Sequence, residues 1–190
     1  MIEQPILHTR RLILRLFNLA DAADVQRLAG AYEIAATTLT IPHPYEDGMA
    51  ETWINTHPAQ LADGTGIVYA ITLRETGALC GTVGLTIKTE HQRAELGYWL
   101  GVPYWGRGYC TEAAETLLDY GFRTLELHRI LAVHLTRNPA SGRVMQKIGM
   151  RHEGTLREHI RKWGVFETIE CYAILRDAWE AAAGRGQASY

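Results

Sequence analysis

The stretch that decides the fold reads PYWGRGYCTE, residues 103–112. It carries two glycines, Gly106 and Gly108, just before a segment with the spacing of an amphipathic helix. Glycines let the backbone turn tightly and leave its amide groups uncovered by side chains. The first turn of a helix adds unpaired N–H donors and a partial positive charge. The stretch therefore predicts a binding site for a phosphate or a pyrophosphate.

Two common phosphate-binding patterns do not fit this stretch. The dinucleotide fingerprint requires a third glycine at the position of Thr111, and the Walker pattern requires a Gly-Lys-Ser/Thr sequence that does not follow. On spacing alone, a glycine-rich turn from strand to helix without any ligand stays open.

The segment after the glycines has the clearest helical periodicity in the chain. Its apolar or small positions recur at helical spacing: Ala114, Leu117, Leu118, Gly121, Phe122 and Leu125. Its opposite face is polar: Glu112, Glu115, Thr116, Asp119 and Arg123. We expect a long helix here, with one apolar face against a sheet.

The first half of the chain predicts a strand, two helices and three further strands. A first strand is expected at Arg10–Phe17 and a helix at Asp21–Gly30. A second helix is expected at Asp47–Ala62, where Pro58 breaks or kinks it. Turn residues and a polar stretch then separate three β segments that form an antiparallel meander: Ile67–Leu73, Leu79–Ile87 and Arg93–Leu100.

The second half predicts a strand, a helix and a hairpin. A buried strand is expected at Ile130–Thr136. Asn138 and Pro139 have the character of a helix N-cap and first residue, and Gly149 ends that helix. Two last β segments flank a turn at residues 162–164: Arg151–His159 and Val165–Leu175. The order β-α-α-β-β-β-α-β-α-β-β predicts an α/β fold in the broad sense.

Composition excludes several classes of protein. The 190 residues predict one domain over 1–183 and a flexible tail over 184–190. A net charge of -2 argues against a general binder of nucleic acid or anionic membranes. Three separated cysteines, the absence of a signal peptide and the absence of a long apolar run predict a cytoplasmic protein with free thiols. The eight histidines form no ligand pattern, so no metal is expected.

Four segments in order resemble the GNAT acetyltransferases, and in particular their RimJ/RimL branch. The glycine stretch is similar to the acetyl-CoA pyrophosphate loop of that family. The other three are similar to its opening strand, the strand before its loop and its next helix: TRRLILR (9–15), AELGYWL (94–100) and NPAS through KIGM (138–150). The likeness extends from Thr9 to Trp179. It implies a mixed, mostly antiparallel seven-stranded sheet flanked by helices, and members of this branch are often homodimers.

The resemblance implies acetyl-CoA as the cosubstrate. The pyrophosphate would be held by the amides of six residues: Gly106, Arg107, Gly108, Tyr109, Cys110 and Thr111. The strand Glu95–Leu100 would splay from 130–136, so that the pantetheine arm enters the gap and pairs with the backbone. Asn138 would hydrogen-bond that arm, a role compatible with that of an N-cap. A backbone N–H from the Tyr98, Trp99 and Leu100 region would take the carbonyl oxygen.

The resemblance also implies candidates for proton transfer. Glu95 is the first candidate base and Glu158 the second, and each has the alternative of a surface glutamate. Many GNAT enzymes place a tyrosine near the leaving thiolate, but the matching residue here is Met145, which cannot donate a proton. Ser141, one turn earlier, resembles the hydroxyl that takes this role in RimL-like members, with a local backbone contact as its alternative.

Cys110 has a rival interpretation as a nucleophile, because a thiol at a helix N-terminus can have a lowered pKa. We expect a small buried filler instead, because alanine or glycine usually occupies the matching position in the family.

The expected reaction is acetyl transfer to a primary amine, with a protein N-terminal α-amine preferred as the acceptor. At pH 7, deprotonating an α-amine costs about 1.4 kcal/mol and deprotonating a lysine about 4.6 kcal/mol, so a modest base suffices for the former. Two alternatives stay open. One is a small-molecule amine such as a polyamine, an amino acid or an antibiotic, and the other is a CoA-binding sensor without catalysis.

Overall fold

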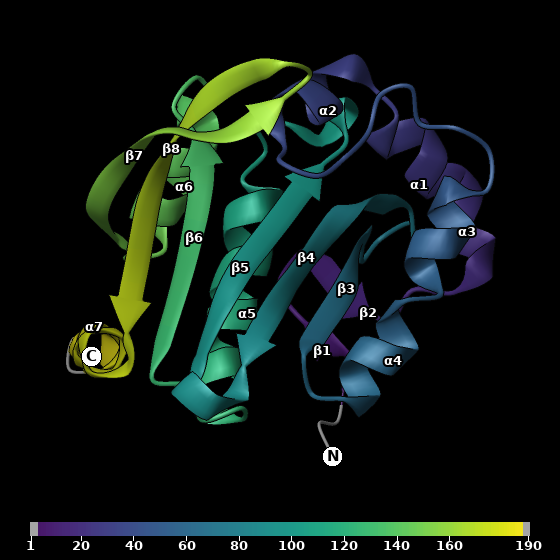
Figure 1. The fold of residues 1–190 in the computed structure, drawn as a ribbon. Helices are drawn as coiled ribbons and strands as arrows, with labels where there is room; N and C mark the ends of the chain where they lie inside the picture. Colours follow the sequence, from purple (N-terminus) through teal and green to yellow (C-terminus); the bar gives the residue numbers. More distant parts are fainter. Residues whose placement is uncertain (1–3, 188–190) are drawn as a thin grey trace.

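A computed structural model of the protein describes residues 4–187 and contains one mixed sheet with helices on both faces (Figure 1). The strands are β1 (Leu7–His8), β2 (Leu12–Arg15), β3 (Gly66–Leu73), β4 (Leu79–Lys88), β5 (Arg93–Leu100), β6 (Arg129–Leu135), β7 (Arg151–Lys162) and β8 (Val165–Leu175). Their order in the sheet is β1-β2-β3-β4-β5-β6-β8-β7. Only β5 and β6 pair in parallel among these neighbours.

The sheet confirms the predicted GNAT-like architecture and corrects its strand number. Residues 4–187 contain eight strands instead of seven, because Leu7–His8 forms a two-residue strand against β2. So short a strand has no periodicity of its own, and only its partner defines it. The predicted meander and the final hairpin are present.

Seven α-helices surround the sheet within the described residues. They are α1 (Ala22–Ala29), α2 (Tyr32–Thr37), α3 (Met49–Ile54), α4 (His57–Ala62), α5 (Tyr109–Arg123), α6 (Pro139–Lys147) and α7 (Arg176–Gln187). The predicted 47–62 helix is two short helices, with Pro58 in the first turn of the second. The expected tail of 184–190 begins inside α7, and residues 188–190 lie outside the described residues.

The helices divide between the two faces of the sheet. On one face, α5 buries Leu117, Leu118 and Phe122 against the central strands, and α6 adds Met145 to the same core. On the other face, α1 and α3 pack over β3 and β4 in a second, smaller cluster. Strand alternation assigns each residue of β5 to one of these faces: Ala94, Leu96, Tyr98 and Leu100 lie on the side of the large core, and Glu95, Gly97 and Trp99 face away from α5.

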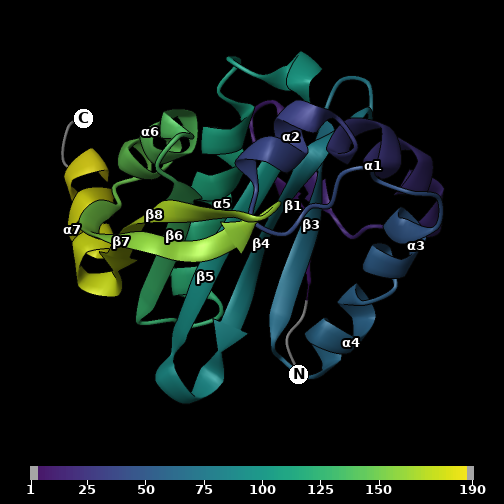
Figure 2. The same cartoon turned by 45° about the horizontal axis from the view of Figure 1, so that its top comes forward.

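The β7–β8 hairpin extends past the sheet towards α2 (Figure 2). At its tip, the ring of Trp163 stacks on Tyr32 of α2 with centroids 5.6 Å apart. The buried Lys162 donates to the carbonyl oxygen of Ile41 at 3.5 Å. The hairpin tip therefore closes against α2 and the loop that follows it.

Candidate active site

The strands β5 and β6 separate along their length, as expected. Only three residue pairs join them, at Arg93–Arg129, Ala94–Ile130 and Glu95–Leu131. From residue 96 onward β5 keeps its partner β4 but has no residue paired with β6. One edge of β5 is thus left with backbone groups that no neighbouring strand uses.

A cleft of about 1350 Å³ begins at this separation. It is lined by β5 and β6, by the loop before α5, by the first turns of α6, and by the 37–49 segment. Its volume exceeds the roughly 300–1,000 Å³ of a typical small-molecule pocket. The cleft is therefore large enough for more than one small molecule.

The glycine loop forms one end of the cleft with its amides exposed. Gly106 and Gly108 have φ angles of 73° and 78°, so the chain turns through the left-handed region before α5 begins at Tyr109. Within residues 4–187, no acceptor takes the amide hydrogens of 106–111. A Cβ on Gly106 would meet nothing within 4 Å. These amides and the positive end of α5 fit an anionic group.

Cys110 lines the cleft from the first turn of α5 and packs against the large core. Burial raises the pKa of its thiol to about 12, which keeps the sulfur protonated near neutral pH. This supports its interpretation as a filler. The three cysteines, Cys80, Cys110 and Cys171, are free.

The first turn of α6 brings Asn138 and Ser141 to the opposite wall. Asn138 caps the helix, as expected, and its Oδ1 accepts from the Ser141 amide at 3.3 Å. Its Nδ2 donates to the Thr37 carbonyl at 3.2 Å, which joins α6 to the end of α2. A contact with a pantetheine arm stays a prediction.

Tyr98 supplies a hydroxyl that the sequence did not assign to the site. Its Oη lies 3.0 Å from Ser141 Oγ and 3.0 Å from the Ser141 carbonyl oxygen. Burial, and to a lesser degree the nearby Cys110, raises the pKa of Tyr98 above its ordinary value. The phenol therefore stays neutral near pH 7. Met145, which occupies the position where many GNAT enzymes have a tyrosine, is buried in the core. The two hydroxyls form a donor pair that bridges β5 and α6.

The floor of the cleft is the sheet face that points away from α5. Gly84 pairs directly with Gly97 across β4 and β5, and the next pair on the same face of the sheet is Thr86 with Glu95. A Cβ on Gly97 would meet nothing within 4 Å, so the space above this strand is open. Trp99 closes the other side of the glycine pair. Glu95 therefore stands at the edge of an open floor.

Glu95 is exposed to the cleft and has no hydrogen-bond or ion-pair partner within residues 4–187. Loss of contact with solvent raises the pKa of the Glu95 carboxyl above its ordinary value, and the positive charge of Arg93 only partly offsets this rise. A raised pKa and a free lone pair suit a base that takes a proton from a bound group.

Glu158 does not line the cleft. It occupies a bulge of β7 with a φ of 51°, its side chain is exposed, and its amide donates to Thr168 Oγ1 at 3.2 Å. The structure therefore brings Glu95 and Ser141 to one cleft and leaves Glu158 outside it. Within the described part of the chain, no three His, Cys, Asp or Glu side chains lie together as metal ligands. In the same part, no helix is both long and apolar enough to span a membrane.

Comparison with known proteins gives one consistent result. Residues 11–151 match the family model of the acetyltransferase (GNAT) domain. The uncharacterized N-acetyltransferase YoaA of Bacillus subtilis is 33% identical over 90% of this chain and 97% of its own length. The putative ribosomal N-acetyltransferase YdaF of the same organism is 33% identical over 70% of this chain and 73% of its own.

A solved structure has the same fold. The GNAT-family acetyltransferase from Bacillus anthracis superposes with a TM-score of 0.80 at 26% identity, over 91% of this chain and 99% of that one.

Proposed function

The chain belongs to the GNAT acetyltransferase family and is an acetyltransferase, and from this premise we propose that it transfers the acetyl group of acetyl-CoA to the α-amine of a protein N-terminus.

One observation carries the donor side: uncovered amides at residues 106–111 lie at the end of a cleft that opens between two splayed strands. The amides would bind the pyrophosphate, with each charge-assisted bond contributing roughly 1.5–3 kcal/mol. The free edge of β5 would pair with the pantetheine arm. Coenzyme A fits this arrangement because its amide-containing arm can pair with a strand edge while its diphosphate binds a helix N-terminus, and the two lie in one cleft here.

Proton removal from the amine is assigned to Glu95. Its carboxylate faces the open floor beside Gly97, and its raised pKa brings its basicity closer to that of an amine. A protonated α-amine loses its proton at little cost near neutral pH, so Glu95 can act directly or through one water molecule.

Stabilisation of the departing thiolate is assigned to Ser141 with Tyr98. The two hydroxyl oxygens lie 3.0 Å apart, and the Tyr98 hydroxyl also lies 3.0 Å from the Ser141 carbonyl oxygen, to which it can donate. When the Tyr98 hydrogen turns from that carbonyl oxygen to Ser141 Oγ, Ser141 can donate its own hydrogen towards the sulfur. Such a relay replaces the tyrosine that is missing at the buried Met145.

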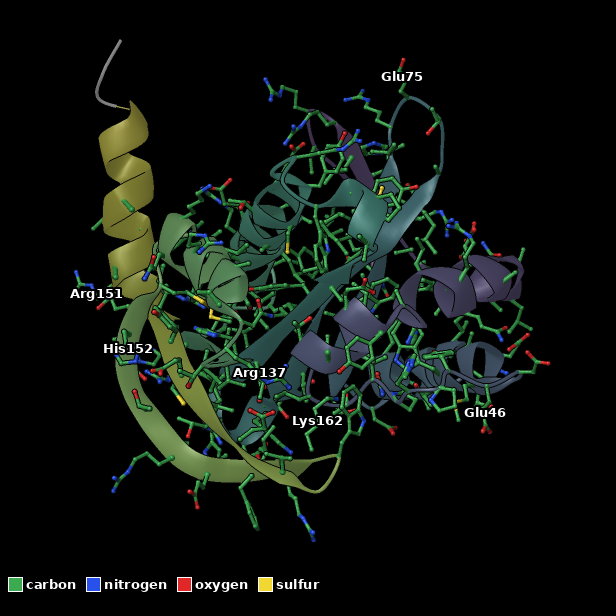
Figure 3. The ribbon with its side chains drawn as sticks, turned by 90° about the horizontal axis from the view of Figure 1, so that it is seen from above. Glu46, Glu75, Arg137, Arg151, His152 and Lys162 are labelled. Atoms are coloured by element: carbon green, nitrogen blue, oxygen red, sulfur yellow. The ribbon has the colours of Figure 1, made fainter. Side chains whose placement is uncertain are left out.

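Charge around the floor favours an acceptor with a single amine. Besides Glu95, the acidic residues lining the cleft are Glu46 and Asp47. Asp47 accepts from Gln26 Nε2 at 2.7 Å, and Glu46 points outward from the molecule (Figure 3). A polyamine would find one free carboxylate for several cations, whereas a peptide N-terminus needs one. The likeness to the putative ribosomal acetyltransferase YdaF supports the same acceptor class.

The test is thiol release from acetyl-CoA in the presence of N-terminal peptides, free amino acids and polyamines. We expect turnover with peptides that stops when the peptide N-terminus is blocked. Turnover with polyamines or amino acids alone would contradict the proposed peptide acceptor and indicate a small-molecule acceptor. Tight CoA binding without turnover on any amine would favour a sensor. Mass spectrometry of proteins from cells with and without the chain then identifies the acceptor.

A further inference from the structure

The opening motif of the chain is joined to the glycine loop by a compact cluster of contacts, which we call the Arg11 clamp: Thr9, Arg11 and Glu112. Glu112 lies in the first turn of α5 and Arg11 immediately before β2, 101 residues earlier. The guanidinium Nε donates to Glu112 Oε2 at 2.7 Å, and the Arg11 amide donates to Oε1 at 2.9 Å. The Thr9 hydroxyl donates to the same Oε1 at 2.6 Å.

The same guanidinium contacts the loop itself. Its Nη1 donates to the carbonyl oxygen of Arg107 at 2.9 Å, and the group lies 4.7 Å from the centroid of the Tyr109 ring. Arg107 stands between the two left-handed glycines, so a hydrogen bond at its carbonyl fixes the peptide plane on which the neighbouring amides depend. The bond from Arg11 fixes the direction of the Arg107 carbonyl and therefore of the Gly108 amide in the same peptide plane. The amides of residues 108–111 then have no acceptor within residues 4–187 and are free for a ligand.

The Arg11 clamp also explains why the acidic residue Glu112 can lie next to a site that would bind an anion. Burial alone would raise the pKa of Glu112, but hydrogen bonds from Thr9 and Arg11, with the charge of Arg11, lower it below its ordinary value. The carboxylate is therefore ionised, and without Arg11 its charge would oppose a diphosphate one turn away. Paired with Arg11, it serves as an anchor for the loop instead.

We propose that Arg11 is a positioning residue for donor binding, holding the 106–111 amides in their binding geometry through Glu112 and the Arg107 carbonyl. This inference rests on the proposed use of acetyl-CoA. It gives Thr9 and Arg11 of the opening motif a role in donor binding, which the proposed chemistry at Glu95 and Ser141 does not.

The experiment compares two acetyl donors, acetyl-CoA and S-acetylpantetheine, which lacks the pyrophosphate. For Arg11→Met we expect kcat/KM for acetyl-CoA to fall about tenfold or more, with the loss in KM, and kcat/KM for S-acetylpantetheine to stay within twofold of wild type. A merely structural role would lower both values equally, and that result would overturn the proposal. Unchanged kinetics with acetyl-CoA would overturn it as well.

Three further variants separate positioning from charge. Arg10→Met removes the same charge at the adjacent exposed arginine, which makes no side-chain hydrogen bond or ion pair within residues 4–187, and it should behave as wild type. Arg11→Lys keeps the charge without the forked geometry and should stay as impaired as Arg11→Met; full recovery would show that charge alone acts.

Glu112→Gln weakens the anchor and should reduce CoA affinity measured by calorimetry. A tighter complex would mean that Glu112 only repels the diphosphate, which contradicts the clamp. Wild-type protein that binds no CoA would instead refute the proposed function, and that outcome is distinct from each of these.

Discussion

At the scale of single residues, the cleft separates the two glutamates that were the first and second candidates for the base. Glu95 faces the open floor with a raised pKa, while Glu158 lies in a β7 bulge outside the cleft lining. The sequence nominated both through the family resemblance, with Glu95 first. It could not show that Glu158 lies outside the cleft, because the bulge at that position depends on the irregular pairing of β7 with β8.

Glu95→Gln tests the assignment of the base. We expect kcat to fall on the order of a hundredfold, because the amide cannot accept the proton of the amine. In the wild type, kcat/KM should decline as the pH falls through the raised pKa of Glu95, since protonation removes the base. The variant should lack this decline while CoA affinity is retained.

Glu158→Gln and Glu90→Gln serve as controls for this prediction, because neither side chain lines the cleft. Both should keep wild-type turnover. If Glu95→Gln and Glu158→Gln both turn over normally, neither carboxylate is the base.

The Ser141 and Tyr98 hydroxyls should act as one unit. We expect Ser141→Ala and Tyr98→Phe each to lower kcat severalfold with little change in the KM for acetyl-CoA, and the double variant to be no worse than the more impaired single variant. Steady-state kinetics of the three variants provide the measurement. Fully multiplicative losses would show that the two groups act separately.

At the scale of elements, the sequence predicted best those strands and helices whose ends are marked by caps, prolines or glycines. The strands β5 and β8 have the predicted limits, and α6 begins after Asn138 with Pro139 in its first turn. Gly149 then has a φ of 84°, as a residue after a helix end requires. Caps, prolines and glycines act over one turn, so the sequence displays them directly.

Short helices were harder to predict. The helices α2, α3 and α4 have six residues each, which is too few for a helix to be stable alone, and packing defines them. Ile34 and Ile54 are buried in this way, yet each lies in a segment without a full helical period. The same limit applies to the Arg11 clamp, since 101 residues separate Arg11 from Glu112.

The glycine loop yields a prediction with an internal control. Gly106→Ala and Gly77→Ala both place a Cβ at a positive φ, of 73° and 72°, in open space. Each should therefore cost about 1–2 kcal/mol of folding stability, measured by denaturant unfolding. Only Gly106→Ala should also weaken CoA binding, because its Cβ enters the space in front of the amides. Equal CoA affinity in the two variants would contradict this role of the loop.

At the scale of the whole molecule, two cores lie on opposite faces of the sheet. The large core of α5 and α6 holds one side of β5, and the cluster of α1 and α3 holds β3 and β4 from the other. Within the sheet, β5 diverges from β6 after Glu95, so the splay lies between the β1–β5 part of the sheet and the β6–β8–β7 part (Figure 1). The sequence predicted this splay only through resemblance, because no local pattern records how two strands diverge.

His57 makes the second cluster sensitive to pH. Its ring is buried, packs against Trp53 at 4.5 Å and Phe17 at 5.5 Å, and neither nitrogen has a hydrogen-bond partner within the described residues. Burial lowers the pKa of His57 to about 4. The unfolded chain, with a pKa near 6.5, therefore binds a proton first as the pH falls.

Stability should consequently decrease between about pH 6.5 and pH 4 by up to about 3 kcal/mol and then level off. Urea unfolding across this range provides the measurement. His57→Leu should remove this part of the pH dependence, whereas His159→Gln, at an exposed position, should leave it unchanged. An unaltered pH profile in His57→Leu would show that His57 does not stay neutral in the folded protein.

The central claim is that the amides of residues 106–111 bind the diphosphate of coenzyme A. The most direct measurement is a titration of ¹⁵N-labelled protein with coenzyme A, followed amide by amide in NMR spectra. We predict saturable shifts that are largest at Gly106, Gly108 and the first turn of α5, and that dephospho-CoA reproduces while pantetheine does not. Binding that leaves these amides unshifted, or no binding at all, would contradict the account.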